Sequence, residues 1–204
     1  KKNGEKLFGD EIFWHRSELI KLHHVFSHNP KKLNCTWKKN DTTDDRNYIP
    51  ASLYNLMYHD LYLLYIYIKD KKLESLDVFN KNEKLHFSAK FEDVEIEFLY
   101  DRKSEMEDIH NISGVDLKRT SEDALSKMLK QVFEGSVIFE YNEKRTLFVN
   151  KIIDEFRSRI FENIAVVGGG IFGCTTAWML AKEGYNVDLY EKNDDIITQA
   201  SNIN

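Results

Sequence analysis

The chain has 204 residues, 42% of them hydrophobic and 31% charged, a composition typical of a soluble globular protein with one large or two smaller domains. Its net charge of −5 does not favour nucleic acid as a partner. Two cysteines, Cys35 and Cys174, are too few for a disulfide scaffold or a cysteine-based metal site. We therefore expect no metal and a reducing, cytoplasmic compartment. Because the chain begins at Lys1 and ends 13 residues after Glu191, we expect a fragment, inactive by itself, of a longer protein.

The first 160 residues are expected to form an α+β domain. Its predicted elements are, in chain order, a helix at 14–26, a strand at 33–38, a helix at 53–68, strands at 73–79, 85–91, 94–100 and 109–117, and helices at 120–133 and 142–160. The clearest alternation of apolar and polar residues is VEIEFLY, from Val94. Successive strands without intervening helices predict an open, mainly antiparallel sheet.

The most apolar stretch of the chain is Leu53–Ile68. Its 16 residues include Asn55, His59 and Asp60, and it falls short of the roughly 20 apolar residues that cross a bilayer. We therefore predict a buried helix and no membrane span. Tyrosines at 54, 58, 62 and 65 repeat at helical spacing, which predicts a packed stripe whose hydroxyls reach the rim of the core.

This order of elements resembles the C-terminal domain of the glucose-fructose oxidoreductase and inositol dehydrogenase family, Gfo/Idh/MocA. That family has an acid four residues before a histidine on the helix facing the nicotinamide. ASLYNLMYHDLYLL places Asn55 and His59 at that spacing, while GVDLKRTSEDALSKML and NEKRTLFVNKIIDEF resemble the closing helices. The resemblance implies that His59 is a catalytic acid or base and that the small-molecule substrate is a sugar derivative.

One departure from this family affects the chemistry. Asn55 stands where the family usually has Asp, and an amide can orient His59 but cannot stabilise its charged form as a carboxylate would. The alternative for His59 is a hydrogen-bonded helix histidine in a domain kept for scaffolding or substrate binding.

The end of the chain carries a dinucleotide-binding pattern. From Ile164, the sequence IAVVGGGIFGCTTAWMLAKEGYNVDLYEKN predicts a strand, a helix and a second strand that ends on Glu191. In this pattern Gly168 permits the turn, Gly170 lets the backbone approach a pyrophosphate, and Gly173 lets the helix lie close to the sheet. The helix N-terminus favours the phosphates. We expect the residues around the pyrophosphate to be Gly168, Gly169, Gly170, Ile171, Phe172 and Gly173.

The acid at the end of the second strand indicates which dinucleotide is bound. The Glu191 carboxylate can accept the ribose hydroxyls but would repel a 2′-phosphate, which argues against NADP. FAD and NAD both present an ADP half to such a unit.

The segment EKNDDIITQASNIN, which begins at Glu191, distinguishes these two cofactors. With VVGGGIFG before it, this segment resembles the amino-terminal signature of FAD-dependent oxidoreductases related to D-amino-acid oxidase (DAO) and glycerol-3-phosphate dehydrogenase. The resemblance implies FAD, with Lys192, Ala200 and Ser201 among the cofactor-binding residues. NAD stays the alternative.

The sequence as a whole predicts an α/β protein. Residues 1–160 form the Gfo/Idh/MocA-like α+β domain with an open, mainly antiparallel sheet, and residues 161–204 begin a truncated, Rossmann-like FAD-binding domain. The expected function is that of an FAD-dependent oxidoreductase fused to a sugar-dehydrogenase-like domain. Two alternatives stay open: an NAD-dependent Gfo/Idh-type dehydrogenase, and a non-catalytic protein that assembles, for example as a homo-oligomer, through its sheet domain.

Overall fold

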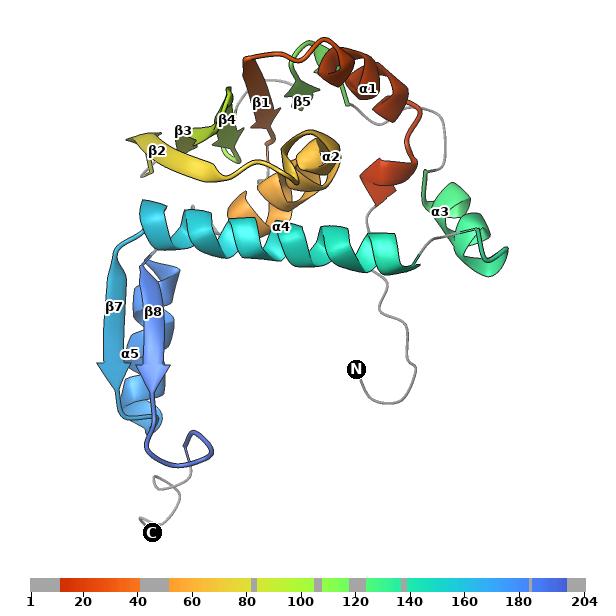
Figure 1. Ribbon diagram of the computed structural model, residues 1–204. Coiled ribbons are helices and arrows are strands. Elements are labelled where there is room, and N and C mark those ends of the chain that lie inside the picture. Colours follow the sequence, from red (N-terminus) through yellow and green to blue (C-terminus); the bar gives the residue numbers. More distant parts are fainter. Residues whose placement is uncertain are drawn as a thin grey trace. The chain divides into compact units, whose positions relative to one another are not determined.

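The computed structural model describes residues 12–40, 52–81, 84–104, 108–117, 124–136, 139–183 and 185–197. The chain divides into two compact units, Lys1–Asp154 and Glu155–Asn204, whose elements are labelled in Figure 1. The division falls within helix α4 (Phe139–Ile160), whereas the predicted domain boundary comes directly after this helix.

The first unit is built on a six-stranded sheet with the strand order β2-β3-β4-β1-β5-β6. Its strands are β1 (Lys32–Lys38), β2 (Leu73–Asn80), β3 (Leu85–Phe91), β4 (Val94–Asp101), β5 (Ile109–Ile112) and β6 (Val115–Asp116). All neighbouring strands are antiparallel except β1 and β4, which are parallel. The predicted fold class, a mixed α/β protein with a mainly antiparallel sheet, is confirmed.

The two faces of this sheet differ in polarity. On strand β4 the side chains of Val94, Ile96, Phe98 and Tyr100 are buried, as the alternation predicts. Polar side chains on the opposite face pair across the strands: Ser88 with Glu95 at 2.9 Å, His86 with Glu97 at 2.8 Å and Lys90 with Glu74 at 2.8 Å. The apolar core of the first unit therefore lies on one side of the sheet.

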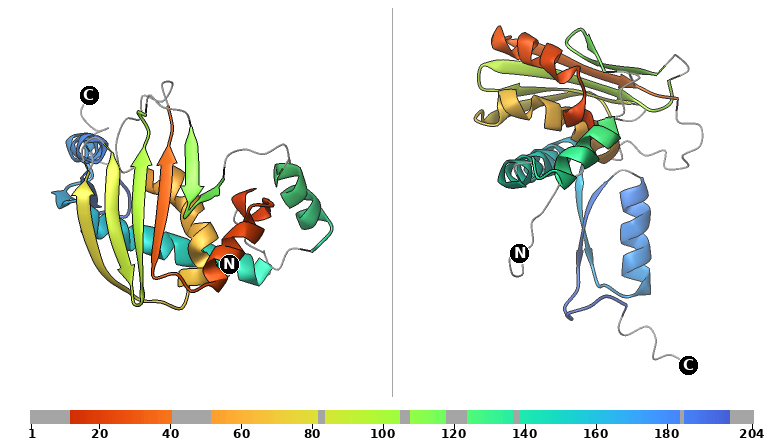
Figure 2. Two further views of the ribbon diagram at one scale, coloured as in Figure 1. Left: turned by 90° about the horizontal axis from the view of Figure 1, so that it is seen from above. Right: turned by 90° about the vertical axis from the view of Figure 1, so that its right-hand side faces the viewer.

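Helix α2 (Tyr58–Ile68) lies on the buried face, between the sheet and α4 (Figures 1 and 2). It continues directly from a π-helical turn, η2 (Leu53–Met57), so together they match the predicted helix. The Tyr65 ring contacts the rings of Tyr141 and Phe148 on α4 at centroid distances of 5.8 and 5.3 Å. A largely apolar helix must bury most of its surface, and seven of the eleven residues of α2 are buried. In the described part of the chain, no helix combines the length and apolarity of a membrane span.

The tyrosine stripe of this helix is packed unevenly. Tyr62 is fully buried, Tyr65 nearly so, and Tyr54 is exposed. The Tyr58 hydroxyl donates to the Tyr62 hydroxyl at 3.2 Å, and Tyr62 in turn shares a hydrogen bond with Thr146 on α4. The buried hydroxyl of Tyr62 is therefore satisfied inside the core rather than at its rim.

Two predicted elements are each divided in the structure. The predicted helix at 14–26 consists of a short 3₁₀ turn, η1 (Ile12–His15), and helix α1 (Leu19–Ser27). The predicted strand at 109–117 is a hairpin of β5 and β6, because Ser113 and Gly114 adopt φ angles of 47° and 88°. Two successive residues at positive φ form the tight turn that joins antiparallel strands.

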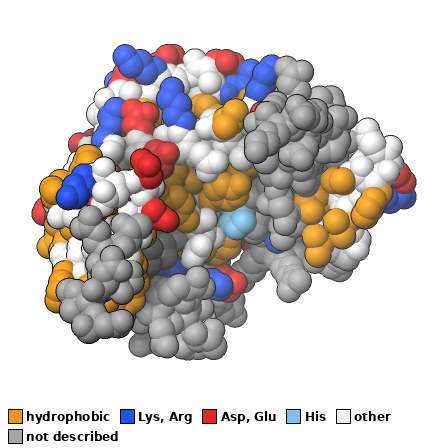
Figure 3. Space-filling model, turned by 90° about the horizontal axis from the view of Figure 1, so that it is seen from below, with side chains coloured by type: hydrophobic (Ala, Val, Ile, Leu, Met, Phe, Trp, Pro, Cys, Tyr) orange, Lys and Arg blue, Asp and Glu red, His pale blue; other side chains and the backbone are white. Residues whose placement is uncertain are grey.

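Helix α3 (Ala124–Phe133) is amphipathic. Ala124 and Met128, four residues apart, are buried, whereas Leu125, Leu129 and Phe133 are exposed. Figure 3 shows hydrophobic side chains at several places on the lower face of the molecule.

The second unit contains a strand–helix–strand motif of β7 (Asn163–Val167), α5 (Ile171–Lys182) and β8 (Asn186–Tyr190). Strands β7 and β8 are parallel and in register from Asn163↔Asn186 to Val167↔Tyr190. No described side chain of α5 is buried, and Val167 and Phe172 are 84% and 86% exposed. Parallel sheets in globular proteins are covered on both faces, so this unit presents more apolar surface than is usual for such a motif.

Candidate functional site

The glycine-rich turn between β7 and α5 requires glycine at two positions for different reasons. Gly168 has a φ of 104°, and its N–H donates to the Tyr190 carbonyl at 2.8 Å, which ties the turn to the end of β8. A Cβ atom on Gly173 would lie 1.7 Å from the Gly168 carbonyl oxygen. Helix α5 can therefore start this close to the strand only because Gly173 has no side chain.

Gly169 and Gly170, which lie between these two glycines in the sequence, differ in how much space surrounds them. Gly170 is the extended N-cap residue of α5, and a Cβ atom there would meet no other atom within 4 Å. A Cβ atom on Gly169 would lie 2.9 Å from Glu191 Oε2 and 3.0 Å from Ile196 Cγ2. The open side of the turn is thus at Gly170, directly before the N-terminus of the helix.

The first turn of α5 is suited to an anion. No side chain caps the helix at Gly170, while Ile171 and Phe172 begin it with exposed side chains. Ile171 and Phe172 can therefore contribute their backbone N–H groups to a binding site for an anion, because these groups lie at the positive end of the helix dipole. The turn thus offers unobstructed amides beside the open Cα of Gly170.

Glu191, directly after β8, lies against this turn. Its Oε2 accepts a hydrogen bond from the Gly169 N–H at 2.5 Å. Its Oε1 accepts two from Asn193, from the backbone N–H at 3.0 Å and from the side-chain Nδ2 at 2.9 Å. Hydrogen bonds from the backbone of Asn193 and then Gly169 hold the pKa of the Glu191 carboxyl below its usual value. The carboxylate is therefore ionised at neutral pH and is an acceptor for hydroxyl groups.

Of the remaining predicted cofactor residues, Lys192 acts on Glu191 through its backbone and its charge, both of which lower the pKa of the Glu191 carboxyl. Lys192 is exposed. Ala200 and Ser201 lie outside the described residues. The structure thus brings together the glycine turn, the start of α5 and Glu191.

The predicted residues of the first unit lie at the junction of η2 and α2. Asn55 is exposed in the π-helical turn, and His59 is half-buried in the first turn of α2. The His59 ring lies 5.8 Å from the Trp37 ring and 5.8 Å from the Tyr58 ring. A π-helical turn bonds residue i to i+5 rather than i+4, so the pair does not lie on an uninterrupted α-helical stretch. The catalytic role of the two residues stays a prediction.

A buried polar cluster next to His59 was not predicted. Asp60 is fully buried, and its Oδ1 lies 2.6 Å from His110 Nε2 on β5, while its Oδ2 accepts from the Tyr100 hydroxyl on β4 at 2.8 Å. The Trp37 ring stacks on the His110 ring with a centroid distance of 3.8 Å. A charge in the most apolar helix is a signal that a buried partner exists, because an unpartnered buried charge is costly. The sequence does not indicate which distant residues supply that partner.

This cluster also changes its neighbours electrostatically. Burial, and next the charge of Asp60, raise the pKa of the Tyr100 hydroxyl well above its usual value. The same two causes raise the pKa of the Cys35 thiol. Both groups therefore stay protonated at neutral pH, which keeps Tyr100 a hydrogen-bond donor to Asp60.

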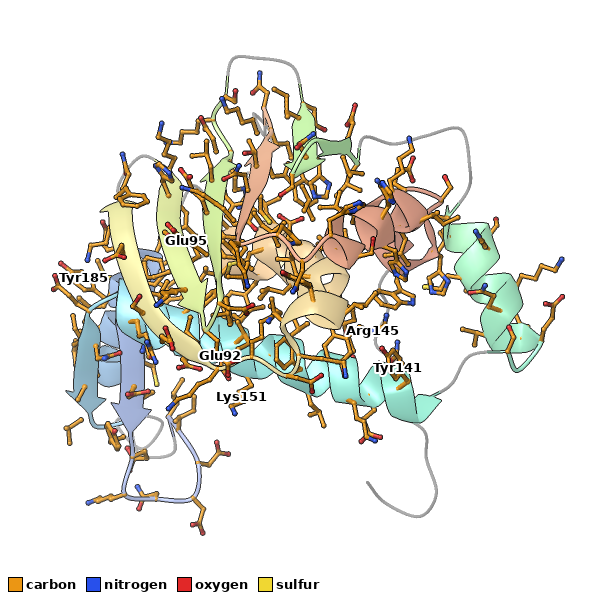
Figure 4. All side chains as sticks on the ribbon, turned by 45° about the horizontal axis from the view of Figure 1, so that its top comes forward. Glu92, Glu95, Tyr141, Arg145, Lys151 and Tyr185 are labelled. Atoms are coloured by element: carbon orange, nitrogen blue, oxygen red, sulfur yellow. The ribbon has the colours of Figure 1, made fainter. Side chains whose placement is uncertain are left out.

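A second buried charge lies on α4. The Arg145 guanidinium carbon is 3.6 Å from the centre of the Trp14 ring and 5.5 Å from the centres of the Tyr62 and Tyr141 rings. Arg145 and Tyr141 project from the same part of α4 (Figure 4). Aromatic faces stabilise a guanidinium, so these rings surround the cation where α2, α4 and η1 meet. Among the described residues, no group of three or more His, Cys, Asp or Glu side chains is arranged to hold a metal ion.

A parallel strand–helix–strand unit with a glycine turn and a terminal acid is the geometry in which dinucleotides are commonly bound. Comparisons with known proteins give matches to both units of the chain. Residues 163–204 match the family model "DAO: FAD dependent oxidoreductase". The fold of the chain is similar to that of the WlbA (WbpB) dehydrogenase from Thermus thermophilus. Both components of the resemblance in the sequence are therefore matched, the FAD-dependent one by a family model over residues 163–204 and the other by similarity of fold.

Two solved structures of this dehydrogenase give the extent of the similarity. The complex with NAD and UDP-GlcNAcA has a TM-score of 0.54, and the complex with NAD and alpha-ketoglutarate one of 0.55. In each case the sequence identity is 9%, and the match covers 72% of this chain and 54% of the dehydrogenase chain. The chain thus spans about half the length of the dehydrogenase, and at this identity the similarity concerns the fold.

Proposed function

We propose that the chain is part of an FAD-dependent oxidoreductase and that its second unit binds the ADP half of FAD. The observation that carries this proposal is the meeting of three features at one place. They are the open Cα of Gly170, the uncapped start of α5 and the ionised carboxylate of Glu191. The match to the FAD-dependent oxidoreductase family covers the same residues and supports the choice of FAD.

Each feature would hold one part of the cofactor. The backbone N–H groups of Ile171 and Phe172 would bind the pyrophosphate, aided by the helix dipole. Glu191 would accept the hydroxyls of the adenosine ribose. When bound, FAD supplies an acceptor for a hydride from a C–H bond next to a hydroxyl or amine. The protein residues described above would contribute binding and orientation to that chemistry.

NAD is the second candidate cofactor. Both WlbA structures contain NAD, and a carboxylate at the position of Glu191 suits the ribose of either dinucleotide. The same carboxylate would repel the 2′-phosphate of NADP. Affinity for FAD over NAD is therefore the measurement that separates the two candidates.

For the first unit we propose a substrate-binding role with a sugar derivative as the substrate class. One WlbA structure holds UDP-GlcNAcA, and the first unit places His59 beside the aromatic rings of Trp37 and Tyr58. A histidine side chain can take or give a hydroxyl proton. In this proposal His59 exchanges the proton and Asn55 orients the substrate or the histidine.

Titration of the purified chain with FAD and with NAD tests the cofactor. We expect FAD to bind with quenching of flavin fluorescence and NAD to bind more weakly, as followed by calorimetry. Binding of NAD without FAD would favour the second candidate. If neither dinucleotide binds while the circular dichroism spectrum shows a folded protein, the proposal is wrong.

A further inference from the structure

The chain after β8 folds back onto the glycine turn. Asn193 donates two hydrogen bonds to Glu191 Oε1, and the Ile197 N–H donates to the Gly169 carbonyl at 2.7 Å. The Ile196 side chain also lies near Gly169, since a Cβ atom on that glycine would be 3.0 Å from Ile196 Cγ2. Gly169 is thus held at both of its backbone polar groups: its N–H donates to Glu191, and its carbonyl oxygen accepts from Ile197.

We propose that Asn193 is a positioning residue that fixes the Glu191 carboxylate for the ribose of a bound adenine dinucleotide. This inference rests on the proposed function of the second unit. Asn193 would touch neither the cofactor nor the substrate, and would act only through Glu191.

The hydrogen bonds explain how Asn193 would do this. A free glutamate side chain samples many rotamers, and ordering it costs conformational entropy. Asn193 and Gly169 hold the two carboxylate oxygens from opposite sides, so this ordering is already complete before a ligand arrives. Each carboxylate oxygen has two lone pairs, and Oε1 already accepts two hydrogen bonds from Asn193. Asn193 therefore leaves Oε2, the oxygen beside the glycine turn, to face the ribose.

The charge state of Glu191 gives a second consequence. Hydrogen bonds from the backbone of Asn193 and Gly169 lower the pKa of the Glu191 carboxyl. The side-chain donor of Asn193, at 2.9 Å, likewise favours the ionised form. As pH falls through the pKa of this carboxyl in the unliganded chain, protonation removes an acceptor and dinucleotide affinity is lost. Without the Asn193 side chain, that loss of affinity should occur at a higher pH.

The test is a double-mutant cycle on FAD affinity with the purified chain. Asn193→Ala removes the side-chain donor and keeps the backbone one, so we expect affinity to fall about 3- to 10-fold at neutral pH. In the Glu191→Gln background the same change should have no further effect. Asn193→Asp, which places a like charge beside Glu191, should weaken binding more than Asn193→Ala does. The matched control is Asn186→Ala, which removes a side-chain hydrogen bond to Asn163 at the other end of β8 and should leave FAD affinity unchanged.

The pH profile distinguishes positioning from a merely structural role. Between about pH 3 and 6, the acid limb of FAD affinity should move to higher pH in Asn193→Ala and should disappear in Glu191→Gln. An equal loss in the presence and absence of the Glu191 carboxylate, with no shift of the acid limb, would overturn the inference. Absence of FAD binding by the unmodified chain would instead contradict the proposed function.

Discussion

Asp60 is a carboxylate with no exposed surface, and its two oxygens contact two other buried polar side chains, His110 and Tyr100. It joins helix α2 to strands β4 and β5 and so fixes the rotation of the helix against the sheet. His59, the next residue back along α2, is placed beside Trp37 by the same rotation. The cluster around Asp60 is therefore a determinant of stability that also sets the position of the candidate catalytic histidine.

Removal of this carboxylate should be strongly destabilising. Asp60→Ala leaves two buried polar groups without their partner, so we expect the free energy of unfolding to fall by about 3–5 kcal/mol. Urea denaturation followed by circular dichroism measures the change. Asp77→Ala, on the exposed part of β2, is the control and should change the free energy by less than about 0.5 kcal/mol. Similar losses in the two variants would show that Asp60 is not held as described.

The two cysteines should differ sharply in reactivity. Cys35 is fully buried with a raised pKa, whereas Cys174, in the first turn of α5, is half-buried and donates from its thiol to the Gly169 carbonyl at 3.2 Å. Because the thiolate is the reactive species, a thiol reagent such as DTNB should label Cys174 in the folded protein and Cys35 only after denaturation. In Cys174→Ser we expect no labelling under native conditions. Rapid labelling of that variant would contradict the burial of Cys35.

Site residues could be predicted from the sequence where the residues that contact one another are close together in the chain. Gly168, Gly170, Gly173 and Glu191 follow a pattern within about 25 residues whose geometry is imposed by one turn and one helix. Asp60 meets partners 40 and 50 residues away in the chain, across strands whose register the sequence does not specify. The helical spacing of Asn55 and His59 was read as α-helical, and the π-helical turn at Asn55 was not predicted because its hydrogen bonding has no clear sequence signal.

At the scale of elements, the turn before α5 has two glycines that should respond differently to alanine. Gly170→Ala places a methyl group in open space at an allowed backbone conformation, so the free energy of unfolding should change by less than about 1 kcal/mol. FAD binding should be lost, because the methyl group would occupy the position proposed for the pyrophosphate. Gly173→Ala drives a Cβ atom into the Gly168 carbonyl and should destabilise the second unit as well as abolish binding.

Calorimetry with FAD and hydrogen exchange of α5 together measure both effects. Normal FAD affinity in Gly170→Ala would contradict the placement of the pyrophosphate at this glycine. Unchanged exchange in Gly173→Ala would show that the helix can move away from the strand.

The helices and strands of the first unit agree with the predicted ones where the sequence alternates between buried and exposed side chains. Strand β4 matched its alternation because every second side chain enters the core. The predicted strand at 109–117 was divided because the tight turn depends on only two residues, Ser113 and Gly114. Strand order, including the parallel pairing of β1 with β4, is a long-range property and was not predicted.

For the whole molecule, the two units should differ in local stability. Strands β3 and β4 carry many fully buried side chains, whereas the second unit has a helix without a described buried residue. Regions with few buried apolar contacts open more readily, so amides of β7 and β8 should exchange faster than those of β3 and β4. Hydrogen exchange followed by mass spectrometry measures both.

A ligand should remove much of that difference. At a free FAD concentration about 100 times the dissociation constant, binding stabilises the folded site by about 2.7 kcal/mol, which corresponds to a roughly 100-fold slower exchange by local opening. We expect this slowing in β7 and β8 and little change in β3 and β4. Equal slowing in both units, or none in β7 and β8, would argue against a dinucleotide site in the second unit.

Strand β1 lies inside the sheet although it precedes the other strands of this sheet in the chain. Its parallel partner β4 follows roughly 60 residues later, which at about 5–20 residues per second corresponds to several seconds of translation. During that time the buried side of β1, with Leu33 and Cys35, has no sheet to join. The β3–β4 hairpin is local and can form first, after which β1 pairs with β4 and the β5–β6 hairpin pairs with β1 on its other side. During synthesis the first unit is therefore most exposed to mispairing and to chaperone binding at β1, until β4 has left the ribosome.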